Sequence, residues 1–244
     1  MKFQIKDTQI FCFLLFSIFS FAIAIPSAHF WKFNEAHGSI ASDSITGFPG
    51  TISNAEWVVN GKIGTAIHLH GTDQSYVSFG NTIGKFGKSD FTVSLFFKTA
   101  ENFWLYDVLG DRSSFANGNF FSLRMKGDGT ITFELSQGLT GAEYVYVQSK
   151  SGFNDNNWHQ VVMVRLGTLV RLYVDGVLVG QNSSQNIISL NNSNPFKLGR
   201  SLVYPGYQRY SGNAFYDELK MYNVALSDSQ IACLYNKNNN RQNF

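Results

Sequence analysis

Apolar and polar side chains alternate along much of the chain, a pattern that predicts β-strands with one buried face. In the segment 91–98, Phe91, Val93 and Leu95 alternate with Thr92 and Ser94. A period of two places successive side chains on opposite faces of a strand, so one face packs into a core. Shorter segments of similar character predict further strands at 66–70, 76–79, 144–148, 196–198 and 215–222.

Glycine-containing turns join other segments into expected hairpins. Segments 120–125 and 130–135 flank Asp128-Gly129, and Asp-Gly favours a hairpin because its turn requires positive φ. Asp175-Gly176 and Gly167 are turns of the same kind. They predict an antiparallel meander of the three segments 161–165, 169–174 and 177–179.

One helix is expected, near the C-terminus. Ser227 is a favourable N-cap, and Ile231, Leu234 and Tyr235 fall on one face. A polar tail is expected at 237–244. Turn signals recur about every 8–15 residues, as in a sandwich or barrel. The pattern therefore predicts an all-β fold, one antiparallel β-sandwich with a short C-terminal helix.

The first residues are typical of a targeting segment. A weakly basic start is followed by an apolar run at 10–25 that contains Ala22-Ile23-Ala24 near its end, the small-x-small spacing that signal peptidases recognise. The run is short for a spanning helix, which needs about 20 apolar residues. We expect a signal peptide at 1–24 and a secreted, periplasmic or extracellular protein. Cleavage after Ala28 and retention as an anchor are the alternatives.

The composition is rich in aromatic side chains and poor in charged ones. The 244 residues include 23 Phe, 11 Tyr and 4 Trp; charged residues make up 15%, and the formal net charge is +2. Disorder needs few aromatics and a high net charge, and nucleic-acid binders carry a basic stripe. The sequence has neither the composition of a disordered chain nor a basic stripe. Cys233 is the single cysteine beyond the signal, so we expect no internal disulfide. We interpret Cys233 as a small buried hydrophobe, with intermolecular pairing as the alternative.

Several segments, taken in order and spacing, carry a family signal. The first are FWKFNEAHG at 30–38, the segment 64–71 followed by Tyr76-Val77, and 91–98. The clearest are NWHQV at 157–161, VRLYVDG at 170–176, FKLGR at 196–200 and YDELKMYN at 216–223. Together they resemble the laminin-G-like (LamG-like) branch of the concanavalin A-like jelly rolls, the lectin/glucanase family.

The resemblance implies a two-sheet antiparallel jelly-roll sandwich over 29–236, with one curved face. It also implies a sugar-binding or adhesive module, because relatives often have that role in secreted proteins and are sometimes attached to enzymes. Relatives commonly have Asp in the middle of the segment 69–71, where this chain has His70. This departure argues against a carboxylate-dependent role of that loop, although Asp73 follows closely.

A structural calcium ion is a further implication of the resemblance. Relatives often tie the N-terminal strand to the penultimate one through Ca²⁺, which prefers oxygen ligands. The matching ligand here is Asp217, with Asp43 and carbonyls around 34–38 as partners. The alternative is that Asp217 caps a turn or accepts backbone hydrogen bonds. His68 and His70 are expected on one strand face, but two imidazoles alone are fewer ligands than a metal site normally has.

Catalytic motifs are missing from the sequence. Glycoside hydrolysis needs two carboxyl groups across the scissile bond, and the Glu-x-Asp-x-x-Glu strand motif of some enzymes in this superfamily does not occur. The adjacent Asp217 and Glu218 are expected on opposite strand faces. Nucleophile-elbow, phosphate-loop and His-Glu-x-x-His motifs are also missing. We expect no enzymatic activity; carboxylates from distant strands are the open alternative.

Two expected loops combine aromatic rings with guanidinium groups, a mixture that suits sugar recognition and contact surfaces. The loop at 199–213 offers Arg200, Tyr204, Tyr207, Arg209 and Tyr210. The loop at 102–112 offers Trp104, Tyr106 and Arg112. The alternatives are a self-packed loop for the tyrosines and a core position for Trp104.

The leading hypothesis is a secreted, lectin-like carbohydrate-binding module without catalytic activity. Its partner would be a glycan or surface polysaccharide, with no nucleic acid and no membrane contact beyond the signal segment. The alternative is a protein-interaction or adhesion module of the cell surface. A polysaccharide hydrolase or lyase on the same scaffold is the third hypothesis.

Overall fold

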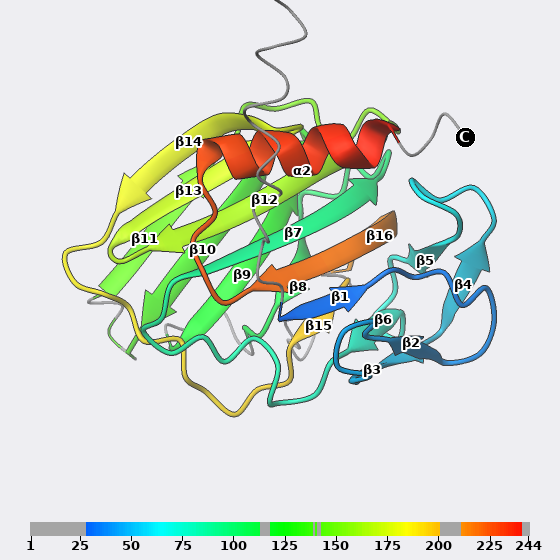
Figure 1. Cartoon of the computed structure of the whole chain (residues 1–244), viewed down its shortest axis with the longest axis horizontal. Coiled ribbons are helices and arrows are strands. Elements are labelled where there is room, and N and C mark those ends of the chain that lie inside the picture. Colours follow the sequence, from blue (N-terminus) through cyan, green and yellow to red (C-terminus); the bar gives the residue numbers. More distant parts are fainter. Residues whose placement is uncertain (1–27, 113–117, 139, 141–142, 201–210, 241–244) are drawn as a thin grey trace, which may run out of the picture.

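The computed structural model describes residues 28–112, 118–138, 140, 143–200 and 211–240. These residues form two antiparallel β-sheets packed face to face, with one helix outside them (Figure 1). Sheet A contains β1 (His29–Trp31), β4 (Ala55–Val58), β5 (Ala66–His70), β7 (Phe91–Lys98), β12 (His159–Leu166), β13 (Leu169–Val174), β14 (Val177–Ser183) and β16 (Asn213–Tyr222). Its order is β14-β13-β12-β7-β16-β5-β4, with β1 paired to β16.

Sheet B lies behind sheet A in Figure 1. It contains β2 (Ile40–Ser42), β3 (Pro49–Ser53), β6 (Tyr76–Ser78), β8 (Leu105–Gly110), β9 (Phe120–Lys126), β10 (Ile131–Gln137), β11 (Glu143–Gln148) and β15 (Lys197–Leu198). The order is β11-β10-β9-β8-β15-β6-β3-β2. Non-consecutive neighbours such as β8 and β15 show that long connections cross between the sheets. The two-sheet antiparallel jelly-roll sandwich expected from the sequence is confirmed.

The inward side chains of both sheets meet in one apolar core. Phe91 and Val93 come from sheet A, and Phe121 and Leu123 from sheet B; all four are buried in the same cluster. The rings of Phe91 and Phe121 lie 5.7 Å apart between centroids, within the range of favourable aromatic pairs. The alternation that predicted the strands therefore decides which side chains hold the sheets together.

The turn between β13 and β14 joins two of the family segments. Asp175 and Gly176 both have positive φ, 51° and 78°, the backbone of a two-residue hairpin turn. The Asp175 carboxylate accepts hydrogen bonds from the His159 ring at 2.7 Å and from the Gln160 backbone N–H at 2.9 Å. Hydrogen bonding to Asp175 raises the pKa of His159. These residues have a structural role: they pin the hairpin to β12.

Helix α2 (Asp228–Asn240) lies across the outer face of sheet A, over β12 and β13 (Figure 1). Ser227 caps it: its hydroxyl accepts from the Gln230 N–H at 3.4 Å, and Gln230 Oε1 accepts from the Ser227 N–H at 2.9 Å, a capping box. Ile231 and Leu234 are buried against Val162. Among the described residues, no helix is both long and apolar enough to span a bilayer.

Two expectations about this C-terminal region are wrong. Cys233 is exposed rather than buried, because it lies two residues after Ile231 and a helix turns about 100° per residue, away from the buried stripe. The helix also continues through Asn240, so residues 237–240 are helical rather than a polar tail.

All of the strands expected from alternation are present, with ends shifted by up to a few residues. The sequence did not predict β1, β2, β3, β4 or β8. The first four have three to five residues each, too few for a clear alternating pattern. β8 was interpreted as part of a binding loop because of its aromatic side chains.

Replacing Ile231 by Ala is expected to lower the free energy of unfolding by about 2–5 kcal/mol, because it leaves a cavity between α2 and sheet A. Urea unfolding of the two proteins measures the difference. Cys233→Ser, on the exposed side of the same helix, is the matched control and should be nearly neutral. Equal losses in the two variants would mean that the helix does not pack as described.

Candidate functional site

Side chains that point away from the core along β8, β9, β10 and β11 form a largely polar layer on the outer face of sheet B. Their inward neighbours, such as Leu123 and Phe133, belong to the core. Strand register places the outward residues in three rows: Asp107, Arg124, Thr132 and Gln148; Ser122, Glu134 and Tyr146; Phe120, Ser136 and Tyr144. We call these ten residues the polar layer.

A chain of opposite charges crosses the polar layer. Arg112 Nη1 lies 2.8 Å from Glu134 Oε2. Arg124 Nη1 lies 3.7 Å from Glu134 Oε1, and Arg124 Nε lies 3.2 Å from Asp107 Oδ1. All four side chains are buried. Buried charges are costly unless they are paired, so the alternation of sign is what allows this face to carry them.

Two tyrosines stand at the open edge of the polar layer. Tyr144 and Tyr146 on β11 are 44% and 46% exposed, and their ring centroids are 5.8 Å apart at an interplanar angle of 30°. Burial and the nearby Glu134 carboxylate raise the pKa of Tyr144, so its phenol stays protonated at neutral pH. The pair therefore presents two aromatic faces beside a fixed charged network.

Two serine hydroxyl groups lie on the same sheet face. The hydroxyl oxygens of Ser122 and Ser136 are buried and have no hydrogen-bond partner among the described residues. Buried polar atoms are normally paired with protein or water. The polar layer thus combines rings, guanidinium groups, carboxylates and hydroxyls on one sheet face.

The expected loop at 102–112 is largely strand β8, and the assignment of Tyr106 to a binding site is wrong. Tyr106 is buried in the core, where its hydroxyl lies 2.8 Å from Met125 Sδ. Burial also raises the pKa of Tyr106. Trp104 precedes the strand and is 58% exposed, so the alternative of a core position does not apply to it; a binding role for Trp104 remains a prediction.

Two of the three expected binding arginines, Arg112 and Arg200, are engaged with the protein itself. Arg112 is buried, pairs with Glu134 and lies over the Phe120 ring at 4.3 Å from its centroid. Arg200 is mostly buried, and its Nη2 lies 3.5 Å from Asp73 Oδ2. Neither side chain extends freely into solvent as a loop arginine would, although Arg112 does belong to the charged chain of the polar layer.

Tyr204, Tyr207, Arg209 and Tyr210 lie outside the described residues, so their binding role remains a prediction. The residues that flank them are described. Arg200 follows β15, and Ser211 forms an isolated parallel bridge with Asp107 of β8. The two ends of the tyrosine-rich segment are therefore attached to neighbouring strands of sheet B, next to the polar layer.

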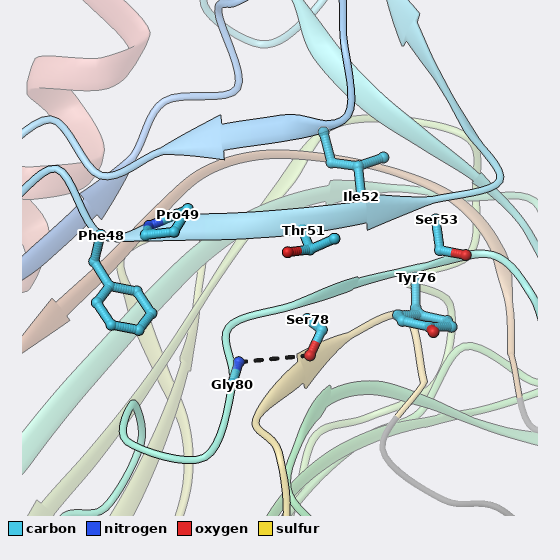
Figure 2. A pocket seen from close by; sticks show the side chains of 8 residues that line it. All are labelled: Phe48, Pro49, Thr51, Ile52, Ser53, Tyr76, Ser78 and Gly80. Atoms are coloured by element: carbon cyan, nitrogen blue, oxygen red, sulfur yellow. Dashed lines mark hydrogen bonds between the residues drawn. The ribbon is translucent and has the colours of Figure 1, made fainter.

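A shallow groove of about 580 Å³ lies farther along the same outer face, over β3 and β6 (Figure 2). Its lining residues are Phe48, Pro49, Thr51, Ile52, Ser53, Tyr76, Ser78 and Gly80. Figure 2 shows Thr51, Ser53, Ser78 and Tyr76 on one side of the strands and Ile52 directed to the other. Lys197 Nζ lies 4.7 Å from the Tyr76 ring centroid. Hydroxyls and a ring also characterise this part of sheet B.

Asp43 does not fit the role of a calcium ligand that the resemblance implied. Its carboxylate accepts hydrogen bonds from the His29 ring at 2.7 Å and from the backbone N–H groups of Phe30 and Ile45 at 2.7 and 3.0 Å. The Thr46 hydroxyl also donates to it. Four donors already satisfy both oxygens, so Asp43 ties β1 to the loop before β3.

Asp217 retains one oxygen that could bind a cation. The residue is completely buried; its Oδ2 accepts from the Ile63 N–H at 2.8 Å, while Oδ1 has no hydrogen-bond partner among the described residues. Burial raises the pKa of Asp217 to about 8. The neighbouring Glu218 is also buried, has φ of 54° within an irregular stretch of β16, and pairs with Lys220 at 2.7 Å. The strand is therefore irregular at this pair, and the expectation that Asp217 and Glu218 lie on opposite faces stays a prediction.

The sequence analysis missed the site formed by the polar layer, although three of its four strands, β9, β10 and β11, were expected. Tyr144 and Tyr146 alternate with Val145 and Val147, and this signal already indicated two outward rings. The contact of Arg112 with Glu134 joins residues 22 positions apart and depends on which strands become neighbours. No local pattern contains that information.

Replacing Glu134 by Gln is expected to lower the free energy of unfolding by about 3–5 kcal/mol, because Arg112 and Arg124 lose their shared buried counter-charge. Chemical denaturation at neutral pH measures the loss. Glu143→Gln is the control, since its carboxylate makes exposed hydrogen bonds to Asn186, and it should cost less than about 1 kcal/mol. Similar effects of the two changes would contradict the importance of the charged chain.

Asp217 should make stability depend on pH. Its pKa of about 8 in the folded protein exceeds the usual 3.8, so the folded state binds the proton more tightly. The associated stability is complete below about pH 4 and is lost as the pH rises to about 8. Asp217→Asn should reduce this loss, as measured by thermal unfolding in metal-free buffer, with pH 4 as the internal reference. An identical pH profile for the variant would contradict this prediction.

Comparison with known proteins places the fold in a family. A family model, Laminin_G_3, described as the concanavalin A-like lectin/glucanases superfamily, matches residues 70–232. No curated protein sequence matches the chain.

Solved structures of similar fold include toxin binding domains and a domain of an arabinanase. That of Paraclostridial Mosquitocidal Protein 1 has a TM-score of 0.68 at 15% identity, over 87% of this chain and 52% of that one. The binding domain of botulinum neurotoxin serotype D/C has a TM-score of 0.66 at 14% identity, and the match covers 87% of this chain and 52% of that one. A third structure is domain 4 of AbnA, a GH43 extracellular arabinanase from Geobacillus stearothermophilus, in complex with arabinotriose. Its TM-score is 0.67 at 20% identity, and the match covers 86% of this chain and 98% of that one.

The chain therefore spans about half of the toxin binding domains that it matches and nearly all of the arabinanase domain. At these identities the likeness to solved structures shows the fold alone. The family model, in contrast, extends from the end of β5 into α2. On that match and on the architecture of its two sheets, the chain belongs to the Laminin_G_3 family of the concanavalin A-like lectin/glucanase superfamily.

Proposed function

We propose that the protein is a secreted glycan-binding module without a catalytic centre, and that the polar layer of sheet B is its binding face. The observation that carries this proposal is the exposed pair Tyr144 and Tyr146 beside the buried chain of Arg112, Glu134, Arg124 and Asp107. Secretion rests on the N-terminal segment 1–24, which lies outside the described residues.

The chemistry of the polar layer suits a sugar. The exposed rings of Tyr144 and Tyr146 can pack against the C–H groups of a pyranose or furanose ring, and their hydroxyls can pair with sugar hydroxyls. The arginine–carboxylate contacts hold their head groups in place before binding, so less conformational entropy is lost when a ligand arrives. Hydrogen bonds that involve charged groups are also the stronger ones.

The same contacts favour binding over hydrolysis. A glycosidase needs one carboxyl group that donates a proton and a second that acts as base or nucleophile. The two carboxylates of the polar layer, Asp107 and Glu134, both face Arg124, and Glu134 also faces Arg112. Both carboxylates are therefore engaged in ion pairs within the protein, which favours binding over the acid and base roles that hydrolysis needs.

A structural calcium ion at Asp217 is part of the proposal. The unpartnered, buried Oδ1 supports this assignment, and the ion would neutralise a carboxylate that burial otherwise favours in its protonated form. Asp43 is not proposed as a ligand because its oxygens are satisfied.

The related structures suggest where to search for the ligand. The similar arabinanase domain was solved with arabinotriose, so arabino-oligosaccharides are the first probes. A protein partner is the alternative, since similar toxin domains are described as binding or receptor-binding domains. A glycan panel and a pull-down from surface extracts distinguish the two partner classes.

The double variant Tyr144→Ala and Tyr146→Ala is expected to weaken binding of the best glycan about tenfold or more, because each ring contact is worth about 0.5–1.5 kcal/mol. Glycan-array binding followed by calorimetry measures the change. Leu166→Ala, an exposed apolar residue of sheet A, is the control and should bind as the parent does.

Two further results bear on the same proposal. A triple variant, Tyr204, Tyr207 and Tyr210→Ala, tests whether the segment between Arg200 and Ser211 contributes to the same site. The proposed binding face would be overturned if the parent protein bound no glycan on the panel. It would also be overturned if both tyrosine variants bound the glycan with unchanged affinity. Release of reducing ends or unsaturated products from a polysaccharide panel would overturn the non-catalytic assignment.

A further inference from the structure

We propose that Glu56, His68 and His70 form a binding site for a divalent transition-metal ion of the zinc class on the outer face of sheet A. This site lies on a different sheet from the polar layer and uses none of its residues. It is also separate from the calcium site proposed at Asp217.

The register of two strands brings the three side chains together. Glu56 of edge strand β4 pairs directly with His68 of β5. His70 follows two positions after His68, so both rings leave β5 on the same face. Between them, Leu69 points into the core. The hairpin thus presents one carboxylate and two imidazoles outward, next to the free edge of sheet A.

The distances suit a single ion. One ligand atom from each of the three residues lies within 4.8 Å of the others. His68 Nδ1 lies 3.5 Å from Glu56 Oε2, and the two imidazole centroids are 4.6 Å apart. Zinc ligands sit about 2.0–2.2 Å from the ion, which places tetrahedral ligand atoms about 3.4 Å from one another. Small side-chain rotations bring all three into range.

Asn213 and Phe215 orient the central ligand. His68 Nε2 donates a hydrogen bond to Asn213 Oδ1 at 2.8 Å. In the neutral ring this leaves the lone pair on Nδ1, the atom that faces the Glu56 carboxylate. The ring also stacks on Phe215 at 4.3 Å and 14°. Metal-binding histidines usually donate their second N–H to such an oxygen, which fixes the tautomer and the ring plane.

Asn213 is itself held in position. The backbone carbonyl of Asn213 accepts a hydrogen bond from the Thr99 hydroxyl at 2.7 Å, and its backbone N–H donates to Glu101 Oε2 at 3.3 Å. A lone pair and a carboxylate that face each other at 3.5 Å repel unless a cation lies between them. A metal ion at this point would be held by all three groups.

The ligand types select the metal. Two imidazoles and one carboxylate favour zinc and its transition-metal neighbours, while Ca²⁺ and Mg²⁺ prefer oxygen ligands. Three protein ligands leave an open coordination position. A groove of about 470 Å³, lined by His68, Thr99, Glu101, Asn156, Asn213 and Phe215 among others, adjoins the site. Water or a ligand in that groove could complete the coordination.

The test is calorimetric titration of the chain, free of affinity-tag histidines, with ZnCl₂. We expect saturable binding of one zinc ion, and a visible Co²⁺ spectrum of low coordination number. Glu56→Gln and His70→Ala should each weaken zinc binding more than tenfold, and Asn213→Ala should weaken it about tenfold through loss of orientation. His37→Ala, an exposed histidine outside the cluster, is the matched control. CaCl₂ at equal concentration should not compete.

Glu56 is exposed, so its variant should fold, and thermal unfolding without metal verifies this for every variant. Absence of zinc binding at micromolar concentration would overturn the proposal. Equal zinc affinity in the parent, Glu56→Gln and His70→Ala would also overturn it, by placing the ion elsewhere. These outcomes are independent of the glycan experiments, because they read metal binding alone.

Discussion

The alternation of side chains about each strand is the constraint on which the whole structure depends. Once Phe121 and Leu123 point into the core, Phe120, Ser122 and Arg124 must point to the other face. A shift of one residue in register would exchange the two sets. The core therefore determines the composition of the outer faces, and the polar layer exists because the opposite half of each strand is apolar.

The outer faces of the two sheets are used differently. Helix α2 covers sheet A over β12 and β13, while the β4–β5 end of that sheet retains Glu56 and the histidine pair. On sheet B, the guanidinium and carboxylate groups compensate one another, so a charged surface can be held close to an apolar core. Both arrangements have an energetic reason. A buried charge is costly unless it is paired, and apolar side chains are more stable when they are covered than when they are exposed to water.

Most of the framework could be predicted from local sequence. The long strands, the Asp-Gly turns and the capped helix each depend on residues that are close in the chain, and β7 matches its predicted bounds. Tyr106 shows where this reasoning failed. An aromatic residue followed by Asp111 and Arg112 is typical of a binding loop, but the segment lies between β9 and β15, so its ring is required to fill the core.

Metal sites show the same division. His68 and His70 were expected on one face, and they lie there, but their third neighbour, Glu56, could not be inferred before the pairing of β4 with β5 was known. Asp43 and Asp217 were grouped by resemblance. The oxygens of Asp43, however, are satisfied by donors from β1 and from the loop that follows Asp43, whereas Asp217 is buried and one of its oxygens has no hydrogen-bond partner among the described residues.

Local patterns thus decided where strands, turns and the helix form, because backbone preference and side-chain period act over a few residues. Strand order alone decided that Arg112 meets Glu134, that Tyr106 is buried, and that Glu56 completes a ligand set with two histidines. These contacts join residues distant in the chain, and their partners are chosen by how two sheets close over a shared core.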